Sequence, residues 1–172
     1  PNKNIVDLFG KPLICWTIEK AIKSKCFDSI IVSTDSEEIA KISIDSGAEV
    51  PYLRPKSISC DNATRNDVIN YFYEKNINAD QIIYLQPTSP FRTISSIRDF
   101  KKFTSIFPQL PSFSISYVSD NPSTILINNK ENWRYLNKDF KMNRQENLEK
   151  IYKMDGKFFY LNRDYWLSLI HI

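Results

Sequence analysis

Short segments rich in β-branched residues alternate with amphipathic segments along most of this chain. Residues 29–33, Ser-Ile-Ile-Val-Ser, are typical of a buried strand, and residues 48–53 and 81–85 are similar. Strands that alternate with helices of ordinary length predict an α/β fold, here a three-layer sandwich with a mostly parallel sheet. The length of 172 residues suits one such domain.

Apolar residues between these strands recur at the three- and four-residue spacing of a helix face. Asp35 or Ser36 is the expected cap of the second helix, and Gly47 fits the left-handed position after its end. Asn62 or Thr64 is expected to start the third helix. Further strands are expected at 112–118 and 157–161, and the pattern predicts helices over residues 13–24, 36–46, 62 or 64 to 76, 94–107 and 163–170.

Residues 119–150 have a different character from the rest of the chain. They contain many Asn and Lys residues and few large aliphatic side chains outside residues 125–127. Such a segment has little apolar surface with which to build its own core. We therefore expect a hairpin-like excursion or arm within the single domain 1–172.

The composition excludes several classes of protein. The formal net charge is +3, with Lys and Arg spread among Asp and Glu, so nucleic-acid binding is not expected. No apolar run approaches the ~18 residues of a membrane span, and no signal peptide opens the chain. Cys15, Cys26 and Cys60 lack metal-ligand spacing, which indicates reduced thiols in a cytoplasmic protein. The single histidine, His171, excludes a His-based triad or a His-rich metal site.

Glycine is scarce, with only Gly10, Gly47 and Gly156 in the chain. A domain of this length would ordinarily have about 7% glycine. The sequence therefore contains no Gly-rich phosphate loop of the Walker or dinucleotide-binding type.

Polar segments follow three of the predicted parallel strands, at residues 33–35, 54–65 and 86–92. In an open α/β sheet, ligands bind beyond the carboxyl ends of the strands, so these segments are expected to converge on one cleft. Their hydroxyl groups and cations suit an anionic, hydroxylated ligand such as a nucleotide or an acidic sugar.

Several of these segments closely resemble the acylneuraminate cytidylyltransferases, also called CMP-sialate synthetases. The strongest resemblance is residues 85–93, Leu-Gln-Pro-Thr-Ser-Pro-Phe-Arg-Thr. The others follow in the same order as in the family and span roughly residues 1–161: Gly-Lys-Pro-Leu at 10–13, Ile-Val-Ser-Thr-Asp at 31–35, Leu-Arg-Pro at 53–55, Asp-Asn-Ala-Thr at 61–64 and Arg-Gln at 144–145.

The resemblance implies a reaction in which a sialic-acid-type sugar acid attacks the α-phosphate of CTP. Pyrophosphate leaves and a CMP-sugar forms, with Mg²⁺ as the cofactor. Such a transfer depends on in-line placement and charge neutralisation. The family also implies a cytoplasmic homodimer, with the arm at 119–150 as its dimerisation element.

The resemblance assigns five residues to the nucleotide side of the site. Lys3 would lie near the phosphates, and Asn4 and Arg54 would contact the nucleotide. The loop from Ala63 to Arg65 would close over it, partly through backbone groups. Arg65 stands where family members usually carry a small hydroxyl residue, so its guanidinium could clamp phosphate or alter the choice of sugar.

Two further residues are assigned to substrate binding and catalysis. Gln86 would hydrogen-bond the sugar acid or the nucleotide. Arg144 would be the catalytic arginine, facing the sugar carboxylate or the phosphates of its own or a partner subunit's site. No metal ligand is assigned, because the family's paired aspartates have no counterpart in these 172 residues.

The family's phosphate loop and first strand also have no counterpart here. We therefore expect the 172-residue chain on its own to be poorly soluble or partly unfolded and to have little activity. Alternatives are a non-catalytic nucleotide-binding or dimerisation module of the same fold, a cytidylyltransferase for legionaminate or Kdo, and an unrelated α/β nucleotidyltransferase or glycosyltransferase.

Overall fold

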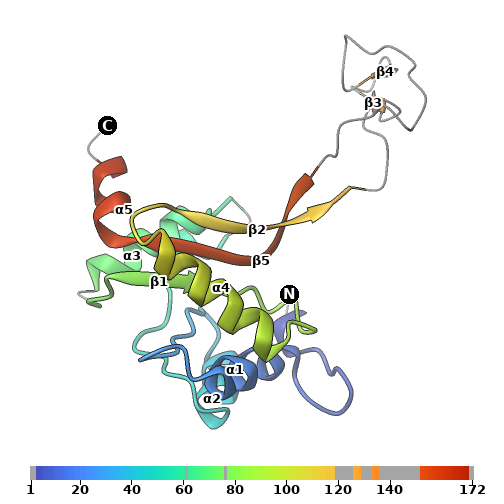
Figure 1. The fold of residues 1–172 in the computed structure, drawn as a ribbon. Coiled ribbons are helices and arrows are strands. Elements are labelled where there is room, and N and C mark those ends of the chain that lie inside the picture. The colour runs from blue at the N-terminus through green and yellow to red at the C-terminus, as the bar shows by residue number, and fades with distance from the viewer. Residues whose placement is uncertain are drawn as a thin grey trace. The chain divides into compact units, whose positions relative to one another are not determined.

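The computed structural model divides the chain into two compact units, Pro1–Phe113 with Gly156–Ile172, and Ser114–Asp155 (Figure 1). The second unit contains residues 119–150, the segment whose composition differs from that of the rest of the chain. The structure describes residues 3–60, 62–75, 77–118, 126–128, 133–135 and 152–170.

All five predicted helices are present in the first unit, each within about two residues of its expected ends. Two short 3-10 helices, η1 (Lys3–Ile5) and η2 (Lys56–Ile58), accompany them. The α-helices are α1 (Leu13–Ser24), α2 (Glu37–Asp45), α3 (Arg65–Glu74), α4 (Ile94–Ile106) and α5 (Arg163–Ile170).

Hydroxyl side chains begin three of these helices. Ser36 caps α2, its Oγ accepting from the Ile39 amide at 3.3 Å, and Thr93 caps α4 in the same way. Thr64 caps α3 in a reciprocal capping box with Asp67. Of the alternatives left open by the sequence, Ser36 and Thr64 are therefore the caps, because their oxygens reach the unpaired first-turn amides.

The main sheet has three strands in the order β1 (Gln81–Tyr84), β5 (Tyr152–Asn162), β2 (Ser112–Tyr117) (Figure 1). Strand β5 runs antiparallel to β1, with Gln81 opposite Asn162 and Tyr84 opposite Phe159. The α/β class is confirmed, and this central pair is antiparallel where the sequence pattern suggested a mostly parallel sheet.

The expected parallel strands at 29–33 and 48–53 pair only through two isolated bridges, Ile31 with Glu49 and Thr34 with Leu53. The pairing register shifts by one residue between these bridges. Pro51 lies between them and has no amide hydrogen to donate, so a continuous ladder cannot pass this point.

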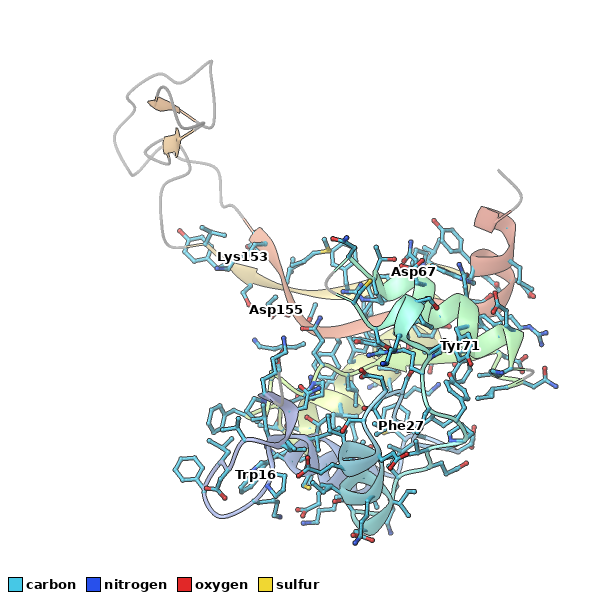
Figure 2. The ribbon with its side chains drawn as sticks, turned by 180° about the vertical axis from the view of Figure 1, so that it is seen from behind. Trp16, Phe27, Asp67, Tyr71, Lys153 and Asp155 are labelled. Carbon is cyan, nitrogen blue, oxygen red and sulfur yellow. The ribbon has the colours of Figure 1, made fainter. Side chains whose placement is uncertain are left out.

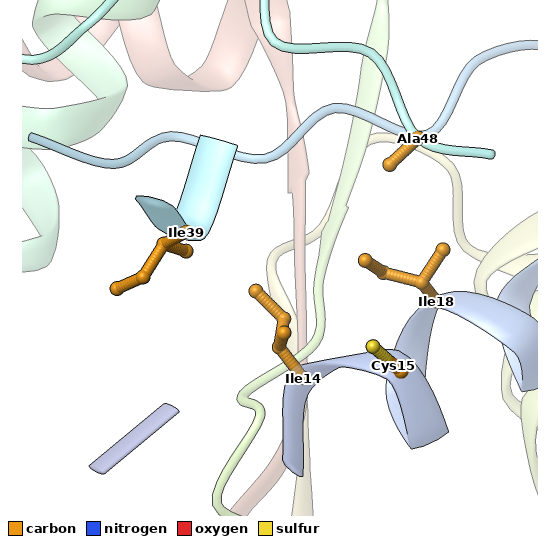
Figure 3. Packing of buried hydrophobic residues seen from close by; sticks show 5 residues of the cluster. All are labelled: Ile14, Cys15, Ile18, Ile39 and Ala48. Carbon is orange, nitrogen blue, oxygen red and sulfur yellow. The ribbon is translucent and has the colours of Figure 1, made fainter. Parts of the chain in front are cut away.

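Two hydrophobic clusters hold the first unit together. One is aliphatic and joins α1, α2 and residue 48 through Ile14, Cys15, Ile18, Ile39 and Ala48 (Figure 3). Full burial of each large aliphatic side chain contributes about 1.5–3 kcal/mol.

The second cluster contains Ile69, Leu161 and Trp166 and joins α3, β5 and α5. The Trp166 indole donates to Asn70 Oδ1 at 2.9 Å, which satisfies its polar atom inside this apolar setting. This cluster fixes the N-terminal half of α3 against the C-terminal half of β5.

The second unit contains the short antiparallel pair β3 (Leu126–Asn128) and β4 (Trp133–Tyr135). Ser114 and Ser116 donate their hydroxyls to the Asp155 carboxylate, the latter at 2.7 Å. The rings of Tyr117 and Tyr152 meet edge to face, with their centroids 6.1 Å apart. Among the described residues, no helix is long and apolar enough to cross a membrane.

Candidate functional site

Arg54 and Asp35 meet where the two parallel segments end. The bridge between Thr34 and Leu53 puts the following residues side by side, and the Arg54 amide donates to the Thr34 carbonyl at 2.7 Å. Arg54 Nη2 lies 3.8 Å from Asp35 Oδ1. Of the three segments predicted to converge on one cleft, these two therefore lie side by side.

The Arg54 side chain is held by a second contact from the following loop. Its Nε donates to Ser59 Oγ at 3.0 Å, and the Ser59 hydroxyl donates to the Pro55 carbonyl at 2.9 Å. The side chain remains 21% exposed. The guanidinium therefore has a preset orientation with donors left to meet an anion, since it carries five N–H groups.

Tyr52 connects this edge to helix α3. Its ring meets the ring of Tyr71, which is labelled in Figure 2, edge to face, with centroids 5.1 Å apart. Burial raises the pKa of the Tyr52 phenol, and the Ser33 hydroxyl and the Arg54 charge partly oppose that rise. The phenol is therefore neutral at physiological pH and serves as a packing group.

Arg65 begins α3 and lies over two aromatic rings. Its Cζ is 4.3 Å from the Phe159 ring centroid and 5.5 Å from that of Tyr84. These two aromatic residues are partners across the β1–β5 pair. A guanidinium on an aromatic face gains about 0.5–1 kcal/mol, so Arg65 is stacked on the sheet instead of extending freely into solvent.

The turn before Arg65 uses its own backbone donors. The Ala63 amide donates to the Cys60 carbonyl at 3.0 Å, and the Thr64 amide donates to Asp67 Oδ2 at 2.7 Å. This loop was expected to close over a nucleotide, partly through backbone groups. In this structure the Thr64 amide is used by the capping box and the Ala63 amide closes the preceding turn.

Gln86 lies in the loop after β1 and is half-buried. Its carbonyl accepts from the Ser89 amide at 3.2 Å and from Arg92 Nη2 at 3.0 Å. Lys20 of α1 donates to the Pro90 carbonyl at 2.6 Å and anchors the far side of the loop. The motif at residues 85–93 is therefore a tied loop, meaning one whose backbone carbonyls accept hydrogen bonds from the side chains of Arg92 and Lys20.

Arg92 is a residue of this loop that the sequence-based assignment omitted. It is 5% exposed, and its Nη2 also donates to the Lys157 carbonyl of β5 at 2.8 Å. A buried arginine near a polar loop is unusual enough to mark a site. Only its place within the motif could have suggested this role from sequence.

The remaining predicted site residues are Lys3 and Asn4, both in η1, and Arg144. Lys3 is exposed and Asn4 half-buried in η1. Within the described part of the chain, no hydrogen bond or ion pair joins either of them to Arg54 or Gln86. Arg144 lies outside the described residues.

A shallow pocket of about 480 Å³ lies between α2 and residues 50–53. Its lining includes Glu37, Lys41 and Tyr52 but none of the predicted site residues. Arg54, Arg65 and Gln86 therefore lie outside this pocket. The described residues contain no group of three or more His, Cys, Asp or Glu side chains that could hold a metal ion.

Comparison with known proteins supports a common family for the whole domain. The family model for cytidylyltransferases matches residues 1–164. CMP-N,N'-diacetyllegionaminic acid synthase of Legionella pneumophila is 38% identical over 72% of this chain and 54% of its own length. Pseudaminic acid cytidylyltransferase of Campylobacter jejuni is 29% identical over 98% of this chain and 75% of its own length.

Another relative is similar over nearly the whole chain. N-acylneuraminate cytidylyltransferase of Escherichia coli is 31% identical over 99% of this chain and 41% of its own length. The chain thus spans about half the length, or less, of two of these three curated relatives.

A solved structure, CMP:2-keto-3-deoxy-manno-octonic acid synthetase complexed with CTP, superposes with a TM-score of 0.73. It is 18% identical and the match covers 99% of this chain and 71% of that one, so it supports the fold alone. The family match over residues 1–164 carries the conclusion that this chain belongs to the cytidylyltransferase family.

Proposed function

We propose that the protein carrying this chain transfers CMP from CTP to a sialic-acid-type sugar acid and releases pyrophosphate. The observation that carries this proposal is the family match over residues 1–164. The three relatives named above are named for N,N'-diacetyllegionaminic acid, pseudaminic acid and N-acylneuraminate. The acceptor sugar is therefore proposed as a class and not as one compound.

The described residues suggest how such a transfer would be assisted. Arg54 has a preset guanidinium at the sheet edge, held by Asp35 and Ser59. A cation fixed in advance neutralises phosphate charge without having to reorganise during the reaction. We propose that Arg54 contacts the nucleotide, that Lys3, Asn4 and the Ala63–Arg65 turn lie on its nucleotide side, and that Arg144 faces the reacting groups.

Gln86 is proposed as a contact of the sugar acid or the nucleotide. Its carboxamide offers both a donor and an acceptor from a loop tied down at both ends. A tied loop can hold a substrate hydroxyl or carboxylate in place with little loss of entropy on binding.

Mg²⁺ is proposed as the cofactor on family grounds. Since the described residues contain no cluster of metal-binding side chains, they do not fit a metal site of their own. We therefore assign no ligand here and place its ligands mainly outside this chain.

We propose a homodimer formed through the second unit. The side chains of Ile115, Tyr117, Tyr152 and Met154 are each more than half exposed. Alternation along β2 and β5 puts them on the face opposite Ser114, Ser116 and Asp155. An exposed apolar ribbon is a common dimer contact, and light scattering that finds only monomer in the full protein would argue against it.

A cytoplasmic location is proposed as well. Cys15, Cys26 and Cys60 are free thiols in the structure. Such thiols suit the reducing cytoplasm.

The function is tested by pyrophosphate release from the full protein with CTP, Mg²⁺ and each of N-acetylneuraminate, legionaminate, pseudaminate and Kdo. We expect turnover with at least one of the first three and none when UTP replaces CTP. Binding of CTP without turnover on any sugar acid would favour a non-catalytic module. Preference for UTP would favour an unrelated nucleotidyltransferase.

A further inference from the structure

Two residues contact Gln86 at its two ends, Gly156 from 70 residues away in the sequence and Arg92 from within the same loop. Gly156 lies against its side-chain carboxamide, and Arg92 holds its backbone carbonyl. The Gly156 contact crosses between β5 and the loop after β1. Neither residue was assigned a role from the sequence.

Two observations connect glycine at position 156 with the place of the Gln86 side chain. Its φ is +71°, a left-handed conformation that side chains other than glycine rarely adopt. A Cβ at this position would lie 2.9 Å from Gln86 Oε1 and 3.5 Å from its Cδ. Any side chain at residue 156 would therefore push the Gln86 carboxamide out of its present place.

Arg92 fixes the backbone of the same residue. One nitrogen, Nη2, donates both to the Gln86 carbonyl at 3.0 Å and to the Lys157 carbonyl at 2.8 Å. Lys157 is the residue after Gly156, so a single buried cation ties the loop to the strand beside the glycine. The guanidinium carbon also lies 5.1 Å from the centroid of the Phe158 ring.

We infer that Arg92 and Gly156 are positioning residues that hold Gln86 in one orientation for its substrate. The inference rests on the proposed function, in which Gln86 contacts the sugar acid or the nucleotide. Arg92 sets where the Gln86 backbone lies, and Gly156 leaves the space that its carboxamide occupies. A binding group held by two such contacts has its orientation fixed before the substrate binds. A residue in a loop can then be placed as accurately as a residue in a strand.

The first experiment is a double-mutant cycle on stability with Gly156→Ala and Gln86→Ala in the full protein. Gly156→Ala should lower the melting temperature, and Gln86→Ala should restore part of that loss by removing the atoms that the new Cβ meets. Gly10→Ala is the matched control. Gly10 also has a positive φ, +78°, but has open space where a Cβ would be, so Gln86→Ala should restore nothing. Strictly additive melting shifts for Gly156→Ala and Gln86→Ala would overturn the inference for Gly156.

The second experiment measures the KM for CTP and for the sugar acid separately. Gln86→Ala identifies which substrate Gln86 contacts, by raising that KM. Gly156→Ala and Arg92→Lys should raise the same KM by about five- to tenfold and leave the other within about twofold. Arg92→Lys keeps the charge and tests the two-carbonyl contact, because an ammonium lacks the flat guanidinium fork. Equal changes in both KM values would mean a merely structural role and would overturn the inference for Arg92.

The two experiments separate this inference from the proposed function. The stability cycle requires no substrate, so it is decided even if the protein does not use CTP. If CTP turnover is present and the cycle shows no coupling, the proposed function stands and the positioning role fails.

Discussion

Two arginines, Arg54 and Arg92, illustrate different ways of holding a cation at this site. Arg54 lies at the open sheet edge, with its contacts to Asp35 and Ser59 made near the surface. Arg92 is buried at 5% exposure and donates to carbonyls of a loop and a strand, those of Gln86 and Lys157, which are 71 residues apart. The half-buried Arg54 still has donors that can meet an anion, whereas the buried Arg92 joins two distant segments.

Because of this difference, we expect substitutions of Arg92 to lower mainly the stability of the protein and substitutions of Arg54 to lower mainly its activity. An exposed ion pair contributes only about 0–1 kcal/mol to folding because water and salt screen it. A buried cation bonded to carbonyls contributes more, because its removal leaves those acceptors without their donor. Variants at the two positions should therefore separate structural from substrate-binding roles.

The largest effect on stability is expected for Arg92→Met. Met fills much of the same volume but donates no hydrogen bond, so the Gln86 and Lys157 carbonyls lose this donor. The free energy of unfolding should fall by about 2–4 kcal/mol, measured by urea denaturation. Arg98→Met is the matched control, since Arg98 also donates to a carbonyl but is exposed. Equal losses for both variants would remove the distinction between buried and exposed arginines.

A smaller effect is expected for Thr64→Ala at the start of α3. This change removes the hydroxyl of the capping box that positions Arg65 over the sheet. Loss of an N-cap hydroxyl costs about 1 kcal/mol, which thermal denaturation can detect. Thr64→Ser keeps the hydroxyl and should retain most of the stability. If Ser and Ala are equally destabilising, the hydroxyl is not what holds this helix.

Arg54→Lys should change stability least while changing activity strongly. The free energy of unfolding should fall by no more than about 0.5–1 kcal/mol. The kcat/KM for CTP should fall about ten- to a hundredfold, because an ammonium cannot reproduce the guanidinium fork. Asp35→Asn is the control, since Ser59 still orients Arg54 in that variant. Unchanged CTP kinetics in Arg54→Lys would remove Arg54 from the nucleotide site.

The smallest effect concerns pH at the α3 start. The Thr64 amide and hydroxyl hold the pKa of the Asp67 carboxylate below its ordinary value (Figure 2). The capping box therefore stabilises α3 above the unfolded pKa of about 3.9, and this contribution is lost as pH falls through the lower folded pKa. Asp67→Asn should flatten the acid limb of a stability profile below about pH 4. If the loss of stability at acid pH is the same in Asp67→Asn as in the unmodified protein, Asp67 does not contribute to it.

Much of the first unit could be predicted from local pattern. Apolar spacing places all five helices because each buries one continuous face, as Ile14 and Ile18 do in α1. The Arg54–Asp35 contact could also be expected, since carboxyl ends of parallel segments share one edge. In both cases the determining interactions are near in sequence or follow from strand direction.

The contacts that could not be predicted are those made across the fold. The ladder at 48–53 breaks into bridges because Pro51 meets a particular partner segment, which only the pairing reveals. Arg65 was expected to clamp phosphate or to alter the choice of sugar, and its contact with the ring of Phe159, 94 residues away in the chain, was not foreseen. Its local sequence shows only that it begins a helix.

The sequence determined the alternation of helices and strands, the hydroxyl caps and the motifs that mark the family, because these depend on a residue and its near neighbours. The tertiary structure decided that β5 lies between β1 and β2 and that Gln86 rests between Arg92 and Gly156. Those positions depend on packing between segments far apart in the chain. No local pattern encodes the distance between Gly156 and a carboxamide 70 residues before it.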